Sequence, residues 1–153
     1  MKFFFDEHIS HLIVEALRCL EHHDRPDFVG KHELVHTKHK YKDHRGPVLD
    51  PEFIPEMTAE GYIIITADHA QKKNRGKHAA EAQAYRNSGA IAFWLPKTYV
   101  APGKKSDEQS SEYKFEQAAK LFKWWPAIKR AAGTARPRDL FDIDDRGRIT
   151  LRT

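Results

Sequence analysis

The chain is poor in cysteine and has no long apolar run. Its one cysteine, Cys19, has no partner for an intrachain disulfide, and its place in a predicted helix favours a small, buried hydrophobic side chain. No apolar stretch approaches the ~20 residues that a membrane-spanning helix needs. The three phenylalanines at residues 3–5 are too short a core for a signal peptide, and acids follow them at once. We therefore expect a cytoplasmic protein that makes no use of a membrane.

The sequence also lacks internal repeats and any shift in composition that would divide it. Hydrophobic residues make up 40% and charged residues 31% of the 153 residues, which excludes a disordered body. Residues 1–153 are therefore expected to form a single domain. The formal net charge is +4, and this modest excess favours a polyanionic partner.

Apolar runs alternate with helical patterns along the first two thirds of the chain. The expected strands, the second of them weak, lie at residues 3–5, 27–35, 61–67 and 90–95. The expected helices lie at residues 9–20, 50–60 and 79–87. The first helix should turn one apolar face to the sheet, formed by Ile9, Leu12, Ile13, Ala16, Leu17 and Leu20. This alternation predicts an α/β fold with right-handed crossovers and a mostly parallel sheet.

Two loops, a long helix and a hairpin are expected in the rest of the chain. Residues 36–47 and 97–111 have loop composition. Residues 112–132 predict an amphipathic helix, interrupted or kinked near Pro126, whose core-facing side holds Phe115, Ala118, Ala119, Phe122 and Trp125. The tail alternates apolar and polar residues about an Asp-Arg-Gly turn, which predicts a β-hairpin.

Acidic residues stand where two of the apolar strands end. Asp6 and Glu7 follow the first strand, and Asp68 follows the strand at 61–67. Asp50, with a proline after it, marks the start of the helix between them. If the strands are parallel neighbours, the acids meet at the sheet edge where open α/β sheets bind ligands. For Asp6 taken alone, a simple helix cap is the alternative.

Three carboxylates at one sheet edge repel one another unless a cation neutralises them. An all-oxygen set suits Mg²⁺ or Mn²⁺, which would polarise a scissile phosphate and activate the attacking water. The pattern therefore indicates phosphodiester hydrolysis. The expected catalytic and metal-binding acids are Asp6, Asp50 and Asp68, with Glu7 as a further ligand and Glu52 as a second choice. Thr66, two residues before Asp68, should point the same way and hold a carboxylate or a water.

Basic residues form three runs, and for each of them a solvated loop is the alternative to a binding surface. The run that follows Asp68 would place cations beside the acids to bind a phosphate backbone, and it consists of Lys72, Lys73, Arg75 and Lys77. The other runs consist of Lys38, Lys40, Lys42 and Arg45, and of Lys104 and Lys105.

Several of these motifs together resemble the PIN-like family, whose PIN-domain relatives include the VapC-type toxins of bacterial toxin–antitoxin pairs. The motifs are FFFDEH, LDPEFIPEMTAEGYIIITAD, AIAFWL, and WWPAI before the terminal hairpin. The resemblance implies a three-layer sandwich with a mostly parallel four- to five-stranded sheet, a C-terminal helix and a hairpin. It also implies a Mg²⁺- or Mn²⁺-dependent ribonuclease centred on Asp6, Asp50 and Asp68. The implied partners are RNA and an inhibiting antitoxin protein, and a homodimer stays open.

The chain departs from the family at one acid. PIN nucleases usually supply a Glu from a helix between the first and third acid positions. The acids available in that region, none in a convincing helical context, are Glu15, Glu21, Asp24, Asp27, Glu33 and Asp43. The site would then hold one metal, use Glu7 or Glu52 instead, or be catalytically weak. A non-catalytic binding or regulatory module is therefore an alternative function.

A zinc metalloprotease is a further alternative, because residues 32–36 match the pattern His-Glu-x-x-His. That motif binds zinc only on a helix, where His32 and His36 share a face. The flanking residues favour an extended segment, which would turn Glu33 away from both histidines. Lys42 also stands where the longer metzincin motif has its third histidine. A helix at residues 32–36 would support the zinc metalloprotease, and a strand there would exclude it.

Overall fold

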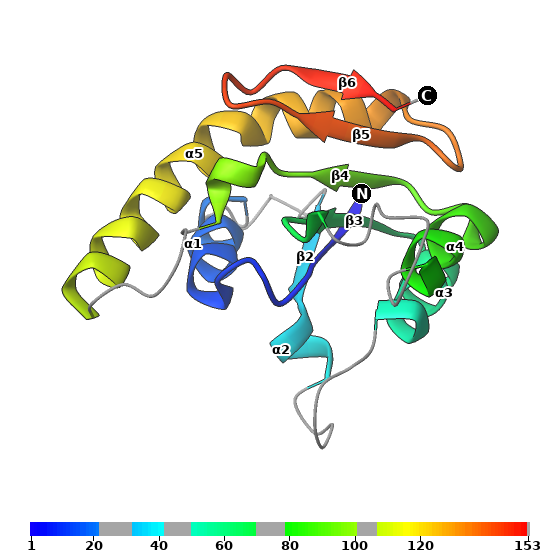
Figure 1. Cartoon of the computed structure of the whole chain (residues 1–153), viewed down its shortest axis with the longest axis horizontal. Coiled ribbons are helices and arrows are strands. Elements are labelled where there is room, and N and C mark those ends of the chain that lie inside the picture. The colour runs from blue at the N-terminus through cyan, green and yellow to red at the C-terminus, as the bar shows by residue number, and fades with distance from the viewer. Residues whose placement is uncertain (22–31, 42–49, 70–78, 101–106, 153) are drawn as a thin grey trace, which may run out of the picture.

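A six-stranded sheet with helices on both faces organises the chain (Figure 1). The structure is a computed structural model that describes residues 1–21, 32–41, 50–69, 79–100 and 107–152, with the backbone alone at residues 50, 51 and 107–111. In chain order the elements are β1 (Lys2–Phe5), α1 (His11–Glu21), β2 (Glu33–His36), α2 (Thr37–Lys40), α3 (Asp50–Ala59), β3 (Tyr62–Thr66), α4 (Ala79–Ser88), β4 (Ala92–Trp94), the 3₁₀ turn η3 (Lys97–Tyr99), α5 (Asp107–Thr134), β5 (Leu140–Ile143) and β6 (Ile149–Leu151).

The sheet has the order β2-β1-β3-β4-β5-β6, and every neighbouring pair except β5–β6 is parallel. The expected α/β fold with a mostly parallel sheet is therefore confirmed. The expected four to five strands are too few, because the terminal hairpin is part of the same sheet. Its first strand pairs with β4 in parallel, with Phe93 opposite Phe141. The antiparallel β6 then forms the outer edge.

Apolar residues bury both faces of the central strands. In β1, Phe3 and Phe5 lie in the core that α1 and α5 cover, and Phe4 lies in the core on the opposite face, under α3 and α4. All three are fully buried. Since side chains alternate between faces along a strand, three apolar residues in a row need a cover on each side. This places the protein in the three-layer class.

The buried faces of α1 and α5 differ from those expected. In α1 the buried residues are Ile13, Val14 and Leu17, whereas Ala16 is exposed and Leu12 and Leu20 are 57% and 61% exposed. Cys19 is also exposed, so the expectation of a buried thiol is wrong. The helix is turned by about one residue from the face that its apolar pattern predicted.

In α5 the core-facing side consists of Leu121, Trp124, Trp125, Ile128 and Ala132. Of the five residues expected there, Trp125 alone is fully buried, and Phe115 is 78% exposed because it precedes the part of the helix that lies on the sheet. The helix begins at Asp107 rather than 112. It continues through Pro126 without interruption, and Figure 1 shows that its direction changes along its length.

Residues 33–41 decide the protease question: the weak strand expected up to residue 35 is present, and a short helix replaces the start of the loop expected from residue 36. Glu33–His36 form strand β2, and Thr37–Lys40 form the short helix α2, which His36 caps by accepting a hydrogen bond from the backbone nitrogen of Lys38. The zinc-protease motif is therefore not helical. His32 precedes this strand and His36 ends it, so the two histidines do not share the helix face that the zinc-protease motif needs, and the metalloprotease alternative is wrong. The upstream part of the expected strand lies outside the described residues.

A half-buried carboxylate joins α1 to α5. Glu21 accepts hydrogen bonds of 2.6 Å from Trp125 Nε1 and from Lys129 Nζ. Burial alone would raise the pKa of Glu21, but the hydrogen bonds from Lys129 and Trp125 outweigh it, so that the pKa is lowered. A lowered pKa in the folded state means that the carboxylate stabilises the fold above its unfolded pKa, and that this contribution is lost as the pH falls through the folded value.

Replacing this carboxylate is expected to be costly at neutral pH. We expect Glu21→Gln to lower the free energy of unfolding at pH 7 by about 1–3 kcal/mol, because the Lys129 ammonium group loses its partner. The deficit should shrink below about pH 4, where the carboxylate is protonated in the unfolded chain. Urea denaturation at several pH values measures it. Glu15→Gln is the control, since the partly exposed pairs of Glu15 with Arg18 and His39 are each worth less than about 1 kcal/mol. An equal deficit at every pH would contradict the argument.

Candidate active site

The carboxyl ends of the parallel strands meet at one edge of the sheet. Asp6 follows β1, His36 and Thr37 stand at the end of β2, Thr66 ends β3 and Asp68 lies two residues further. Backbone hydrogen bonds fix this edge, with Asp6 N donating to Ile65 O at 3.2 Å. Thr37 Oγ1 donates to Phe5 O at 3.2 Å, which holds the end of β2 against β1. Residues far apart in the sequence are thus neighbours.

The hydroxyl of Thr66 links the two aspartates. Thr66 Oγ1 donates to Asp6 Oδ2, and the same oxygen accepts a hydrogen bond of 3.0 Å from Asp68 N. Trp94 Nε1 donates to Asp68 O at 3.2 Å and holds that residue from the β4 side. Thr66 is fully buried, Asp6 is 1% exposed and Asp68 is half-buried. Thr66 therefore has the position expected of it, in contact with a carboxylate.

A histidine is the counter-ion of Asp6. His8 Nδ1 lies 3.8 Å from Asp6 Oδ1, and the backbone nitrogen of His8 donates to the same oxygen at 3.0 Å. The interaction with Asp6 is the largest cause of a raised His8 pKa, partial burial opposes it, and Asp68 and Glu7 add smaller attractions, so that the pKa of His8 is about 9. Positive charge therefore faces the Asp6 carboxylate at neutral pH. The sequence pattern did not single out His8, although it stands two residues after the strand-end acid.

The other predicted site residues have different outcomes. Asp50 begins α3, but its side chain lies outside the described atoms. Glu7 and Glu52 are both exposed. The four basic residues expected to bind nucleic acid lie outside the described residues; these are Lys72, Lys73, Arg75 and Lys77. The structure thus places Asp6 and Asp68 at the same sheet edge, both in contact with Thr66. The contribution of Asp50 stays a prediction.

Two candidates for the missing family Glu prove to be helical. Glu15 and Glu21 lie in α1, contrary to the expectation that no acid in that region has a helical context. Glu15 pairs with Arg18 Nη1 at 3.0 Å and with His39 Nε2 at 2.8 Å. Glu21 is held by Trp125 and Lys129. Glu15 thus contacts α1 and α2, and Glu21 contacts α5, so neither joins Asp6 and Asp68 in this arrangement.

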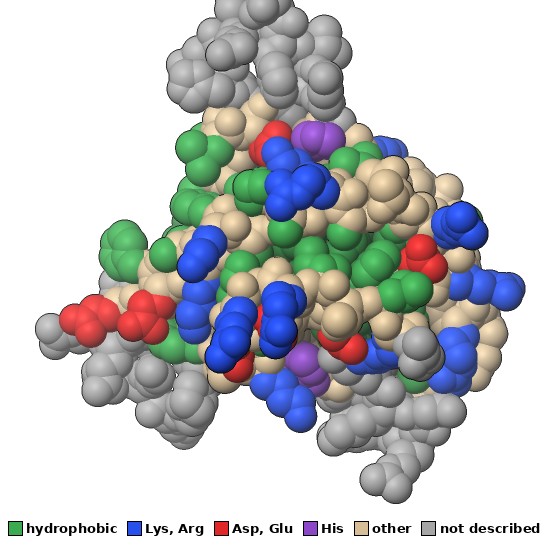
Figure 2. Space-filling view, turned by 90° about the horizontal axis from the view of Figure 1, so that it is seen from above, with side chains coloured by type: hydrophobic (Ala, Val, Ile, Leu, Met, Phe, Trp, Pro, Cys, Tyr) green, Lys and Arg blue, Asp and Glu red, His purple; other side chains and the backbone are tan. Residues whose placement is uncertain are grey.

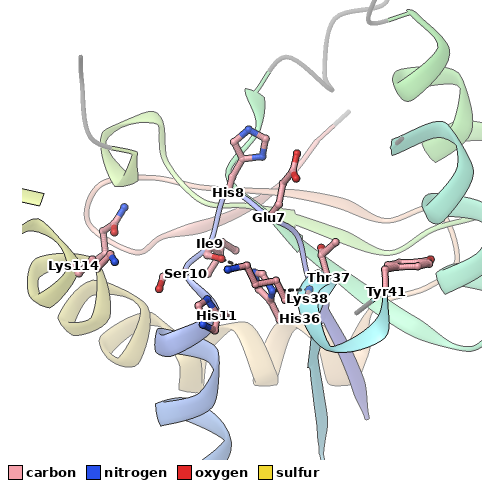
Figure 3. Close-up of a pocket in the computed structure, with 11 residues that line it drawn as sticks. Glu7, His8, Ile9, Ser10, His11, His36, Thr37, Lys38, Tyr41 and Lys114 are labelled. Atoms are coloured by element: carbon pink, nitrogen blue, oxygen red, sulfur yellow. Dashed lines mark hydrogen bonds between the residues drawn. The ribbon is translucent and has the colours of Figure 1, made fainter. Parts of the chain in front are cut away.

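A pocket of about 520 Å³ opens beside the acids (Figure 3). His36 forms part of its wall and is buried. Its Nε2 donates to Ile9 O at 2.6 Å and its Nδ1 accepts from Lys38 N at 3.0 Å, which requires the neutral imidazole. Burial is the main cause that lowers the pKa of His36 and keeps it neutral. The signal that could have found it is register, since His36 pairs with Phe5 immediately before Asp6.

The donor set fits a hard divalent cation. Each oxygen of Asp6 accepts one hydrogen bond and keeps a second lone pair, and Asp68 adds a half-buried carboxylate at the same edge. Within the described ranges, no group of three or more His, Cys, Asp or Glu is arranged to hold a metal ion. Mg²⁺ commonly binds one or two carboxylates and completes its shell with waters and substrate phosphates. The pair of Asp6 and Asp68 suits that mode.

Charge on the β5–β6 side of the molecule is mixed. In Figure 2, Lys and Arg side chains surround a central apolar strip on this face, with acidic groups among them. Two arginines of the hairpin are paired with aspartates, Arg148 with Asp144 at 2.7 Å and Arg152 with Asp142 at 3.0 Å. Since these pairs neutralise much of the hairpin's charge, this face is a weak candidate for binding a polyanion.

Comparison with known proteins assigns the family. A family model described as a PIN-like domain matches residues 1–97, which include β1 to β4 and both strand-end aspartates. The chain therefore belongs to the PIN-like domain family. PIN-like domains are generally nucleases that use divalent metal ions and bind nucleic acid, so the fold is of nuclease type. No curated protein and no solved structure matches the chain. In the described part of the chain, no helix is long and apolar enough to cross a membrane.

The bridging hydroxyl of Thr66 can be tested directly. We expect Thr66→Val to weaken Mn²⁺ binding by about 10–100-fold, because partners of metal-binding carboxylates have effects of this size. Valine keeps the shape of threonine but cannot donate to Asp6 or accept from Asp68 N. Thr66→Ser, which keeps the hydroxyl, is the control and should stay within a few-fold of the wild type. Calorimetric titration with Mn²⁺ measures both variants. Equal weakening by valine and serine would contradict the argument, because the serine variant keeps the hydroxyl.

Proposed function

We propose that the chain is a Mg²⁺- or Mn²⁺-dependent endoribonuclease that hydrolyses phosphodiester bonds of RNA. The observation that carries this proposal is the meeting of Asp6 and Asp68 at one sheet edge, with the Thr66 hydroxyl between them. Membership of the PIN-like family supports it, since these domains are generally nucleases. Two carboxylates held together at a strand-end crevice are stable there only when positive charge balances them.

Each residue has a role in the proposed reaction. Asp6 and Asp68 hold the cation and Asp50 adds a third carboxylate, with Glu7 and Glu52 as further candidates. A bound divalent ion would polarise the scissile phosphate and offset the negative charge that develops on it. Thr66 fixes the orientation of the Asp6 carboxylate, and the cationic His8 beside it attracts the phosphate.

The cellular role proposed is that of the toxin of a bacterial toxin–antitoxin pair, acting in the cytoplasm. It rests on the resemblance to VapC-type toxins, and it implies an antitoxin protein that keeps the nuclease inactive. A homodimer stays open. We also propose that residues 1–153 act as one domain, because strands β5 and β6 extend the sheet that the family match begins. Lys72, Lys73, Arg75 and Lys77 are proposed to contact the RNA backbone.

Metal removal is the first test of this proposal. The purified chain should cleave RNA internally when Mg²⁺ or Mn²⁺ is present, cleavage should stop with a chelator, and it should return when the metal is restored. Expression of the chain in bacteria should arrest growth, and this arrest should depend on the acidic residues of the site. Cleavage that persists in excess chelator would contradict the metal-dependent mechanism.

A non-catalytic binding module is the second candidate function. The observation that favours it is that, in the described part of the chain, no group of three or more His, Cys, Asp or Glu side chains is arranged to hold a metal ion. The same assay decides, because a binding module would bind RNA and cleave none with either metal. Completion of the site by Asp50 would favour the nuclease, and Asp50→Asn tests that contribution.

A further inference from the structure

The pocket beside the acids is formed by parts of the chain that are distant in sequence. Ser10 and His11 stand at the start of α1, Lys38 and Tyr41 lie in and just after α2, and Lys114 lies in α5. Figure 3 shows Lys114 on one side, Tyr41 on the other, and Ser10, His11 and Lys38 between them. The volume of about 520 Å³ falls within the range of small-ligand sites. The fold thus brings polar groups together around a cavity, and neither Asp6 nor Asp68 is among its described lining residues.

Positive charge prevails in this pocket. Lys38 and Lys114 line it, and within the described residues neither ammonium group is paired with a carboxylate. Lys40, by contrast, lies two residues after Lys38 in the same helix and is paired with Glu60 at 2.7 Å. Glu7 is the carboxylate among the described lining residues. Two unpaired lysines, one from α2 and one from α5, favour an anionic ligand.

Aromatic rings also border the pocket. The rings of His11 and His36 have their centroids 6.0 Å apart, and His36 is held as a neutral imidazole by its two hydrogen bonds. Tyr41 borders the opposite side and is fixed by donating to Glu56 Oε2 at 3.1 Å. Planar rings beside ammonium groups are the surroundings that proteins offer to an unpaired base and its phosphate.

The pocket is continuous with the aspartate edge. Glu7 and His8 line it, and His8 Nδ1 is 3.8 Å from Asp6 Oδ1. A ligand in the pocket would therefore lie next to a group bound at Asp6 and Asp68. In a nucleic acid strand, a nucleotide and the adjacent phosphate are neighbours in the same way. One could occupy the pocket while the other lies at the two aspartates.

We propose that this pocket binds one unpaired nucleotide of an RNA strand, beside the phosphate that is cleaved. Lys38 and Lys114 contact its phosphate groups, and the rings of His11 and Tyr41 flank its base. A base that is paired within a duplex cannot enter such a pocket, so the pocket itself accepts only an unpaired nucleotide. This inference rests on the proposed function for the identity of the strand.

The test measures the binding of a labelled RNA hexamer to the full chain by fluorescence anisotropy, at several salt concentrations. A chelator is present so that the RNA is not cleaved. We expect Lys38→Ala and Lys114→Ala each to weaken binding by about 5–10-fold and to reduce the slope of log affinity against log salt by about 0.7. The same hexamer annealed to its complement should bind at least about 10-fold more weakly than the single strand. Lys123→Ala is the matched control, because this exposed lysine of α5 lies about two and a half turns from Lys114 and faces the other way.

The outcomes separate this proposal from the nuclease proposal. Unchanged binding and salt slope in both lysine variants, or equal binding of the duplex, would overturn the pocket. An equal loss in Lys123→Ala would also overturn it, since the effect would then be one of general charge. If hexamer binding depends on Lys38 and Lys114 but no RNA is cleaved with Mg²⁺ or Mn²⁺, the pocket is supported and the nuclease activity fails. If cleavage depends on Asp68 but not on either lysine, the nuclease stands and the pocket fails.

Discussion

Asparagine in place of Asp68 is expected to lower the rate of RNA cleavage by about 100-fold or more, without unfolding the protein. Partners of metal-binding carboxylates already change affinity or activity by about 10–100-fold, so the loss of a ligand carboxylate should exceed them. The amide keeps the size of the side chain but removes the negative charge that balances a divalent cation. The cleavage rate at saturating Mg²⁺, measured on a labelled RNA, gives the ratio to the wild type.

The structure explains why this variant should stay folded. Two contacts that fix Asp68 use its backbone, with its nitrogen donating to Thr66 Oγ1 at 3.0 Å and its oxygen accepting from Trp94 Nε1 at 3.2 Å. Asparagine keeps both. Glu116→Gln, at an exposed position of α5, is the control for the loss of one negative charge and should cleave like the wild type. If Asp68→Asn cleaves RNA at the wild-type rate, the Asp68 carboxylate has no part in the reaction.

The second large effect is expected in stability, from Gly147→Ala. Gly147 lies in the turn of the β5–β6 hairpin with φ +79°, a conformation that costs an L-residue about 1 kcal/mol. An added Cβ would also collide with the indole of Trp124, at 2.7 Å from Nε1 and closer still to Cδ1. Trp124 is 4% exposed and packed in the core under α5, so it cannot move aside without opening the core. We expect a loss of about 3 kcal/mol or more in the free energy of unfolding.

Gly89→Ala separates the two causes of this loss. Gly89 ends α4 with φ +77°, close to the value at Gly147, but nothing lies within 4 Å of an added Cβ. It should lose about 1 kcal/mol through backbone strain alone. Urea denaturation of both variants measures the difference that the Trp124 collision makes. If Gly147→Ala loses no more than Gly89→Ala, the hairpin yields and the close packing against Trp124 is not important for stability.

Local pattern was sufficient for the elements that carry the aspartates. The run Phe3 to Phe5 predicted a strand buried on both faces, and the two cores show why, since Phe4 points away from Phe3 and Phe5. The same reasoning gave β3 and its end near Asp68. Parallel pairing then follows from the helices between the strands, and it brings Asp6 and Asp68 to one edge. Thr66 could be named because side chains two apart in a strand share a face.

Sequence pattern failed where it could not fix the rotation of a helix about its axis or the strand with which a segment pairs. The apolar residues of α1 are spread so widely that the face toward the sheet was chosen wrongly, leaving Leu12 and Cys19 exposed. The tail predicted a hairpin, but not that it would join the sheet beside β4. His36 looked like one end of a zinc motif, yet its strand register with Phe5 makes it a wall of the pocket.

Apart from the short helix α2, the sequence by itself determined the order of strands and helices along the chain, the strand-end positions of Asp6 and Asp68, and the turns at Gly89 and Gly147. These depend on alternation, helical spacing and backbone conformation, which act between residues close together in the chain. Tertiary structure alone decided which face of α1 is buried, that the hairpin completes the sheet, and that Lys38 and Lys114 border one pocket. Those outcomes depend on contacts between segments far apart in the chain, and packing energy chooses among arrangements that local pattern leaves equal.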